Sequence, residues 1–252
     1  MVDRWADRTW RPFGRVDPYY GVLSNEQFRA DRLDAKALDE FFQTGEDHVA
    51  WVLNSIRRSV APDFEPTRVL DFGCGVGRLV LPFARRATEV VGADISPEML
   101  DEARRNMTNA GLTNGTFVRV DEHLENVPGQ FDLVHAYIVF QHIPPARGER
   151  IMLRLARKLV PGGVGALHFV YRREAPALRK LVHAVRKHLP GVNALVNVVQ
   201  GRTMREPFIP MYNYKLDRVV EGLRSIGCSG SSMEFTNHGG HIGAMIFFRM
   251  PE

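Results

Sequence analysis

The chain has 252 residues, enough to bury a substantial core as one domain or as one domain with an attached cap. Its apolar fraction of 44% and charged fraction of 25% are those of a globular protein, and no apolar run approaches the length needed to span a bilayer. The two cysteines, Cys74 and Cys228, exclude a disulfide framework and a cysteine-rich metal site. Since the N-terminus lacks the apolar stretch of a signal peptide, we expect a reducing, cytoplasmic setting.

The net charge of +4 is unevenly distributed along the chain. Residues 146–224 contain 16 Lys or Arg against 5 Asp or Glu, whereas the rest of the chain carries 17 against 24. A basic half can attract acidic substrates, nucleic acid or membrane surfaces, or it can be a solvated helix face. Composition alone leaves these alternatives open.

Residues 24–60 have helical periodicity. Apolar side chains recur there three and four residues apart, first around Phe41 and then from Val49 to Ile56. Gly45 separates the two groups, so we expect it to interrupt the helix. Pro62 and Pro66 then indicate a linker. The sequence therefore predicts an N-terminal helical cap over residues 1–65.

Strands and helices alternate from Thr67 onward. Ser96 and Pro97 are typical of a helix start, and Gly111 of a helix end. Short apolar runs predict five strands and further helices, with strands at 68–72, 89–93, 116–120, 131–137 and 164–171 and helices at 78–87 and 148–159. This alternation predicts a Rossmann-like parallel sheet over residues 66–171, with helices on both faces.

The segment after the fifth strand is too long for a simple connection. We expect a helical cap insertion at 172–214, in which 177–189 form a basic amphipathic helix. A helix at 216–226 and an antiparallel hairpin of 231–237 and 242–250 would complete the core over residues 215–252. The predicted fold class is therefore α/β, with seven strands that are mostly parallel and a helical cap from two parts of the chain.

A glycine-rich turn follows the first strand, with Gly73, Gly75 and Gly77 in the spacing GxGxG. Such a turn lets backbone N–H groups approach a ligand closely. The dinucleotide fingerprint has a different spacing, GxGxxG. Asp71 precedes the turn, and Asp94 ends the second strand, where a carboxylate suits the two hydroxyls of a ribose.

Four segments together resemble the class I S-adenosylmethionine-dependent methyltransferases. They are VLDFGCGVGR at 69–78, VVGADISPEML at 90–100, FDLVHAYIVFQHIP at 131–144 and LVPGGVGALHFVY at 159–171. The final hairpin is similar to the family's antiparallel seventh strand, and DPYYGVLS and FFQTG resemble the caps of bacterial members that act on small molecules. The resemblance implies S-adenosylmethionine as cofactor and a small-molecule acceptor, with no nucleic acid as partner.

The resemblance also assigns roles by matching position. Gly73, Cys74 and Gly75 would pack against the methionine part of the cofactor, and Asp71 would organise the loop or receive the ammonium group. Asp94 would hold the ribose hydroxyls. The remaining cofactor positions flank the adenine or the methionine part: Ile95, Met99, Asp121, Glu122 and Tyr137. Glu122 is bulkier than the residue often found at its position. Asp121 can equally be a solvated turn residue, and Met99 can equally be a residue that packs its helix on the sheet.

Methyl transfer from a sulfonium requires alignment above all, and a hydroxyl acceptor also benefits from a base. His142 is the candidate base, since it follows the fourth strand at the edge where parallel sheets bind ligands; it can equally buttress a loop. His238 and His241, in the last hairpin, are either substrate contacts or parts of an ordinary turn. They lack an obvious third ligand, so we expect no metal.

Arg172 and Arg173 directly follow the fifth strand, where they would recognise an anionic acceptor. Aromatic and apolar residues of the cap are candidate walls for the acceptor, namely Tyr19, Tyr20, Met211 and Tyr212. An RNA or lipid acceptor, with peripheral membrane contact through 177–189, and a non-catalytic cofactor-binding regulator are the alternatives. The sequence does not indicate an oligomeric state.

Overall fold

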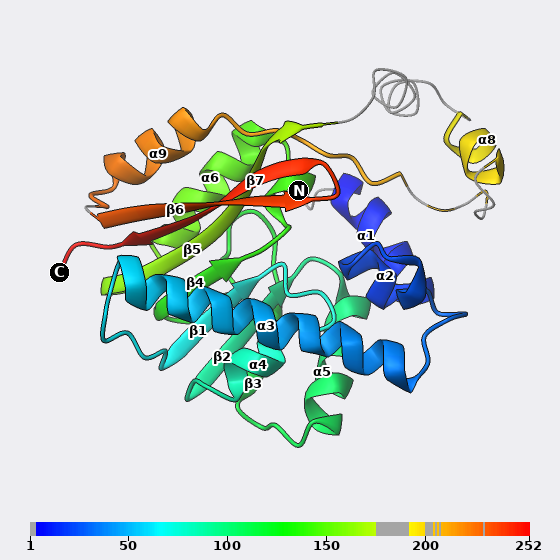
Figure 1. Cartoon of the computed structure of the whole chain (residues 1–252), viewed down its shortest axis with the longest axis horizontal. Helices are drawn as coiled ribbons and strands as arrows, with labels where there is room; N and C mark the ends of the chain where they lie inside the picture. Colours follow the sequence, from blue (N-terminus) through cyan, green and yellow to red (C-terminus); the bar gives the residue numbers. More distant parts are fainter. Residues whose placement is uncertain (1–3, 175–191, 200–203, 205, 207, 229) are drawn as a thin grey trace.

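A seven-stranded sheet with the order β3-β2-β1-β4-β5-β7-β6 forms the centre of the molecule (Figure 1). The computed structural model describes residues 4–174, 192–199, 204, 206, 208–228 and 230–252. The predicted basic helix at 177–189 lies outside these residues. The strands are β1 (Arg68–Phe72), β2 (Glu89–Asp94), β3 (Gly115–Arg119), β4 (Phe131–Ala136), β5 (Leu159–Arg173), β6 (Gly230–His238) and β7 (His241–Arg249).

The first five strands run parallel, and β7 runs antiparallel to both β5 and β6. The predicted fold class is thereby confirmed, including the hairpin that carries the antiparallel strand. β5 is longer than the predicted 164–171, because Leu159 already pairs with Phe131 of β4 and Arg173 pairs with His241 of β7.

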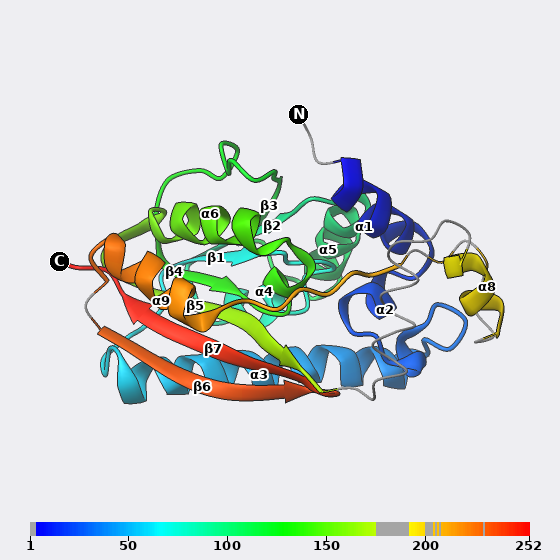
Figure 2. The same cartoon turned by 90° about the horizontal axis from the view of Figure 1, so that it is seen from above.

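Helices cover both faces of the sheet (Figure 2). One face carries α6 (Pro145–Ala156) and α9 (Leu216–Ser225), whose side chains join a buried apolar cluster with Leu70, Val134 and Phe169 of the strands. The other face carries α3 (Ala35–Ser59), α4 (Val80–Ala84) and α5 (Pro97–Asn109), packed on Val69 and Leu133. Ser96 caps α5 through the backbone N–H of Met99, as predicted.

Gly45 does not interrupt α3, which runs unbroken for 25 residues. That expectation was wrong, because a glycine is needed here for α3 to pack closely against the glycine-rich turn. A Cβ atom at residue 45 would stand 2.2 Å from the carbonyl oxygen of Arg78. The missing side chain therefore allows α3 to lie directly against the turn.

The N-terminal elements pack at the end of the sheet where α5 begins (Figure 1). They are α1 (Arg4–Val16), α2 (Pro18–Val22) and the short 3-10 helix η1 (Glu26–Phe28), which share a third apolar cluster with Phe41 of α3. A second short 3-10 helix, η2 (Phe140–His142), follows β4, and α8 (Val192–Val199) belongs to the segment after β5. Within the described ranges, no helix has both the length and the apolar character needed to cross a membrane.

Candidate active site

One pocket at the carboxyl edge of the sheet brings the predicted cofactor positions together. Its lining includes all ten of them: Asp71, Gly73, Cys74, Gly75, Asp94, Ile95, Met99, Asp121, Glu122 and Tyr137. It also includes the candidate base His142. These residues lie at the ends of β1, β2, β3 and β4 or shortly after them, and the parallel arrangement brings these strand ends to one edge.

The glycine-rich turn forms the floor of this pocket. Gly73 has a φ of 75°, and a Cβ there would meet Val139 at 2.3 Å, so this position requires glycine. The backbone N–H of Gly73 donates to the carbonyl of Ala93 at 2.7 Å, which ties the turn to the end of β2. Cys74 is buried, and burial raises the pKa of its thiol, so it fills space in the loop and is not an activated nucleophile.

Asp94 joins the glycine-rich turn to the start of α5. Its Oδ2 accepts the N–H of Gly75 at 3.0 Å, and its Oδ1 accepts the N–H of Ser96 at 2.9 Å. Burial raises the pKa of Asp94, while these two backbone donors lower it. A carboxylate has about four lone-pair sites, so both oxygens keep capacity for further donors such as ribose hydroxyls.

A chain of buried side chains fixes Asp71. Its Oδ1 lies 2.8 Å from Nδ1 of His135, and Nε2 of His135 lies 3.1 Å from Nε2 of His48 on α3. Burial lowers the pKa of His48 well below its ordinary value, so this ring is neutral at pH 7. When His48 donates to His135 and His135 donates to Asp71, Oδ1 holds one hydrogen bond, while the buried Oδ2 has no partner among the described residues.

The far end of the pocket, beside Asp121, is closed by ion pairs with α6. Glu122 forms an ion pair with Arg147 at 3.2 Å and accepts a hydrogen bond from Arg150 at 3.3 Å. Nη1 of Arg154 donates to the carbonyl of Glu122 at 2.7 Å. Glu122 therefore anchors the loop after β3, and Asp121 next to it accepts the N–H of His123.

Apolar side chains from the cap and from the loop after β4 also line the pocket. Trp10 of α1, Val22 of α2 and Val139 after β4 line it, and Val22 fills the space above Gly75. Ile138 has a φ of 62°, which is rare for a β-branched residue and costs about 1–3 kcal/mol. This strained residue sits between Tyr137 and Val139, both of which line the pocket. The pocket lining thus combines charged side chains with apolar ones.

His142 lies at the apolar side, where its ring meets Trp10 edge-on at 5.0 Å. Its Nδ1 donates to the carbonyl of Pro210 at 3.2 Å, and its Nε2 lies 3.2 Å from the amide nitrogen of Gln141. Burial lowers the pKa of His142 to about 4, so the ring is neutral at pH 7. The protonation state suits a base, but Nε2 would have to release Gln141 before it could take a proton.

His238 reaches the pocket through Tyr137. The hydroxyl of Tyr137 lies 2.9 Å from Nε2 of His238, and burial raises the pKa of Tyr137 to about 12. His241, at the other end of the hairpin turn, pairs with Arg173 across the sheet and does not line the pocket. The structure therefore connects one of the two predicted hairpin histidines to the site.

Tyr19 and Tyr20 belong to the core of the cap and do not line the pocket. The hydroxyl of Tyr19 donates to Glu102 at 2.7 Å and lies 3.0 Å from Oδ1 of Asn106. Tyr20 lies 3.8 Å beneath the guanidinium of Arg29.

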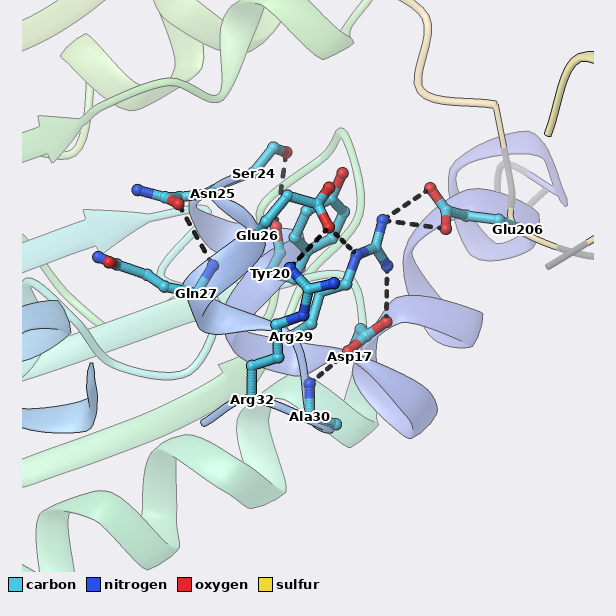
Figure 3. A network of polar contacts seen from close by, with 10 residues as sticks. All are labelled: Asp17, Tyr20, Ser24, Asn25, Glu26, Gln27, Arg29, Ala30, Arg32 and Glu206. Atoms are coloured by element: carbon cyan, nitrogen blue, oxygen red, sulfur yellow. Dashed lines mark hydrogen bonds and ion pairs between the residues drawn. The ribbon is translucent and has the colours of Figure 1, made fainter. Parts of the chain in front are cut away.

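Arg29 binds three carboxylates from two distant parts of the chain (Figure 3). It pairs with Asp17 at 3.1 Å, with Glu26 at 2.9 Å and with Glu206 at 3.2 Å. Glu206 belongs to the segment after β5, so this network fastens that segment to the N-terminal cap.

The other predicted acceptor contacts also lie outside the pocket lining. Arg172 is exposed and pairs with Glu174 at 3.5 Å, and Arg173 is the next residue at the end of β5. Met211 and Tyr212 belong to an extended segment behind η2, where the N–H of Tyr212 donates to the carbonyl of Gln141 at 2.7 Å. This segment supports the loop that holds His142.

Four pocket-associated residues escaped the sequence predictions: Trp10, His48, Arg78 and His135. His135 of β4 lies two residues before Tyr137, so the two-residue period of the predicted strand 131–137 would have placed both side chains on one face. His48 is contributed by α3, 87 residues away in sequence, and no local pattern pairs it with His135. Among the described residues, no three His, Cys, Asp or Glu side chains converge in a geometry that could hold a metal.

The sheet order, the glycine-rich turn and the carboxylate at the end of β2 are features of the class I methyltransferase fold. Residues 69–163 match a family model described as a methyltransferase domain. The chain therefore contains a class I S-adenosylmethionine-dependent methyltransferase domain.

Curated relatives match the same region. An uncharacterized methyltransferase of Synechocystis is 35% identical over 105 residues, which cover 42% of this chain and 48% of that protein. The ubiquinone biosynthesis O-methyltransferase of Erwinia tasmaniensis is 35% identical over 98 residues, which cover 38% of this chain and 39% of that protein. The chain thus spans less than half the length of these two relatives.

Solved structures share the fold over most of the chain. The magnesium protoporphyrin IX methyltransferase of Synechocystis with bound S-adenosylmethionine aligns with a TM-score of 0.58 and 20% identity, over 93% of this chain and 94% of that chain. The N-methyltransferase NodS of Bradyrhizobium japonicum aligns with a TM-score of 0.54 and 13% identity, over 94% of this chain and 100% of that chain. At these identities the likeness concerns the fold.

Proposed function

We propose that this protein transfers a methyl group from S-adenosylmethionine to a small-molecule acceptor, at oxygen or nitrogen. The observation that carries the proposal is the mixed lining of the pocket. It offers Asp71, Asp94 and the glycine-rich turn to a charged cofactor, and it offers Trp10, Val22 and Val139 to an apolar acceptor.

The relatives support the same class of acceptor. Ubiquinone biosynthesis O-methyltransferases and magnesium protoporphyrin IX methyltransferase are named for small-molecule substrates, and NodS for transfer to nitrogen. The pocket opens between the sheet edge and the N-terminal helices, so a bound acceptor would be shielded from water by α1 and α2. The chain's own contribution to the reaction is then alignment of acceptor, methyl group and sulfur.

The test is methyl transfer from S-adenosylmethionine with a deuterated methyl group to fractionated cell extract, read by mass spectrometry. Metabolite, RNA and lipid fractions are assayed separately, with Asp94→Ala as the inactive control. Labelled product in the metabolite fraction alone is expected. Label only in the RNA or lipid fraction would reassign the acceptor, and cofactor binding without any labelled product would indicate a regulator.

For an acceptor hydroxyl, we propose His142 as the base. His142→Asn should then lower kcat by about 100-fold or more and leave the affinity for S-adenosylmethionine unchanged, because a positioned base contributes about 10²–10⁴-fold. Gln141→Glu, which changes the partner of Nε2, should shift the pH profile of kcat. A His142→Asn variant with wild-type kcat would assign this ring to support of the Pro210 segment alone.

A further inference from the structure

The extended segment between α8 and α9 passes directly behind η2 on its way from the cap back to the sheet. We call its described residues, 206 and 208–214, the strap. The N–H of Tyr214 donates to the carbonyl of Val170 of β5 at 2.8 Å, and the N–H of Tyr212 donates to a carbonyl of η2 at 2.7 Å. The strap is therefore fastened to the sheet and to η2 at its C-terminal end.

An ion pair with the cap holds the other end of the strap (Figure 3). Oε2 of Glu206 lies 3.2 Å from Nη2 of Arg29, and the two side chains are only 10% and 13% exposed, so solvent ions screen their attraction little. Arg29 is itself fixed within the cap by Asp17 at 3.1 Å and by Glu26 at 2.9 Å. The backbone carbonyl of Glu206 also accepts from the side chain of Asn197 at 2.9 Å. The strap thus begins at a preformed site of the cap.

Between these two anchors the strap presents the carbonyl of Pro210 to His142. Nδ1 of His142 lies 3.2 Å from this oxygen. A carbonyl oxygen can only accept, so the contact is a hydrogen bond only when Nδ1 carries the proton. Nε2 then carries the lone pair, which is the form of the ring that can take a proton from an acceptor at this nitrogen.

Gln141, the other polar neighbour of the ring, does not distinguish the two tautomers. Its amide nitrogen lies 3.2 Å from Nε2 of His142, while its Oε1 is buried and has no hydrogen-bond partner among the described residues. A side-chain amide can present either a donor or an acceptor by turning over, so Gln141 can serve both forms of the ring. Of these two neighbours, only the carbonyl of Pro210 selects one form.

We propose that the ion pair of Arg29 and Glu206, by holding the strap in place, keeps His142 in the tautomer whose Nε2 is unprotonated. Arg29 and Glu206 are then positioning residues for methyl transfer, and they act on the ring through Pro210. The effect on catalysis rests on the proposed function, since His142 is the base proposed there. The effect on the ring itself is measured without any acceptor.

The test reads the tautomer of His142 by NMR, because the chemical shift of a ring nitrogen depends on whether it carries a proton. His142→Asn identifies its signals among those of the nine histidines. Glu206→Ala removes the ion pair but not the backbone contact with Asn197, and Glu206→Gln keeps an acceptor oxygen without the charge. Glu26→Ala is the matched control, because it removes a carboxylate from the same Arg29 within the cap. Thermal unfolding confirms that each variant folds, and Glu206→Gln carries the comparison if Glu206→Ala does not.

The wild type should show His142 with its proton on Nδ1. Glu206→Ala should lower the ratio of the Nδ1–H form to the Nε2–H form at least about fivefold, which corresponds to the loss of one hydrogen bond of ordinary net strength. Glu206→Gln should lower this ratio less, and Glu26→Ala should keep the wild-type ratio.

The catalytic consequence is measured as the initial rate of transfer of a deuterated methyl group into the metabolite fraction, at saturating S-adenosylmethionine. Glu206→Ala should reduce this rate about 3-fold to 100-fold, because a misplaced base loses part of a contribution of about 10²–10⁴-fold. The affinity for S-adenosylmethionine, measured by calorimetry, should stay unchanged. Glu26→Ala should transfer at the wild-type rate.

A wild-type ring protonated on Nε2, an unchanged ratio in Glu206→Ala, or an equal change in Glu26→Ala would overturn the inference. A changed ratio with an unchanged rate would overturn its catalytic part. If His142→Asn transfers at the wild-type rate, the proposed base is refuted, while the tautomer ratio still decides whether the ion pair acts on the ring.

Discussion

Acid should unfold this protein partly through His168, a buried histidine on β5. His168 is 1% exposed, its Nε2 lies 2.8 Å from the hydroxyl of Thr236, and burial lowers its pKa from 6.5 to about 3. Below pH 6.5 the unfolded chain binds a proton at this position and the folded chain does not, so stability falls as the pH falls. At pH 5.5 the free energy of unfolding is lowered by about 1.4 kcal/mol relative to neutral pH. His48, also buried with a lowered pKa, acts in the same direction.

The measurement is urea unfolding at pH 7.5, 6.5 and 5.5 for the wild type and for His168→Asn. Asparagine keeps a partner for Thr236 and cannot take up the proton, so the loss of stability between pH 7.5 and 5.5 should be smaller by about 1.4 kcal/mol. His123→Asn, at a half-exposed surface position, is the control and should keep the wild-type pH dependence. If His168→Asn loses as much stability as the wild type over this range, His168 is not held neutral by burial and the reasoning is refuted.

Two further predictions concern the pocket and the helix beside it. Asp94→Ala should weaken S-adenosylmethionine binding at least about tenfold, because lost charged hydrogen bonds cost about 1.5–3 kcal/mol; calorimetry giving wild-type affinity would place the ribose elsewhere. Gly45→Ala should lower the free energy of unfolding by up to about 2 kcal/mol in urea titrations, because overpacking costs about 1–3 kcal/mol and alanine returns about 1 kcal/mol of helix propensity. Gly222→Ala, where the new Cβ would meet only the side-chain ends of Met152 and Leu153, should be neutral or stabilising; equal effects at the two glycines would contradict the packing argument.

The sheet and the predicted cofactor positions were accessible from sequence because each depends on short stretches of chain. Local sequence determines the strands, the start of α5 at Ser96-Pro97 and the GxGxG turn. Once the strands are parallel, their carboxyl ends necessarily lie at one edge of the sheet. The prediction for Gly45 was wrong because the role of this residue depends on a tertiary contact with Arg78. A helix-breaking propensity of about 1 kcal/mol is outweighed when a residue without a side chain is the only one that fits against Arg78.

The residues that we propose as acceptor contacts could not be predicted from the sequence. They come from elements whose relative placement depends on tertiary packing. Trp10, Val22 and Val139 lie in α1, α2 and the loop after β4. Nothing in their local sequence distinguishes a wall residue from a core residue. Tyr19 and Tyr20 show the consequence, since two aromatics predicted as walls turn out to be core, while Trp10 nearby reaches the pocket.

Tyr19 has a role that links the cap to the cofactor loop. Its hydroxyl contacts Asn106 of α5, and the side-chain amide of Asn106 donates to the carbonyl of Val76, within the glycine-rich turn, at 2.9 Å. At the start of the same helix, Glu98 pairs with Arg15 of α1 at 2.9 Å. The helix that follows Asp94, α5, is thus contacted by the cap at its start and near its end.

This bracing has a consequence for how the two sides of the pocket depend on each other. The cap supplies the apolar wall through Trp10 and Val22, and it also restrains the turn on which the cofactor would rest. Val22 occupies the volume above Gly75, so any shift of α2 changes both sides at once. A substitution in the cap is therefore expected to alter acceptor selection and cofactor affinity together, whereas the Asp71 and Asp94 contacts, held from the sheet, act on the cofactor alone.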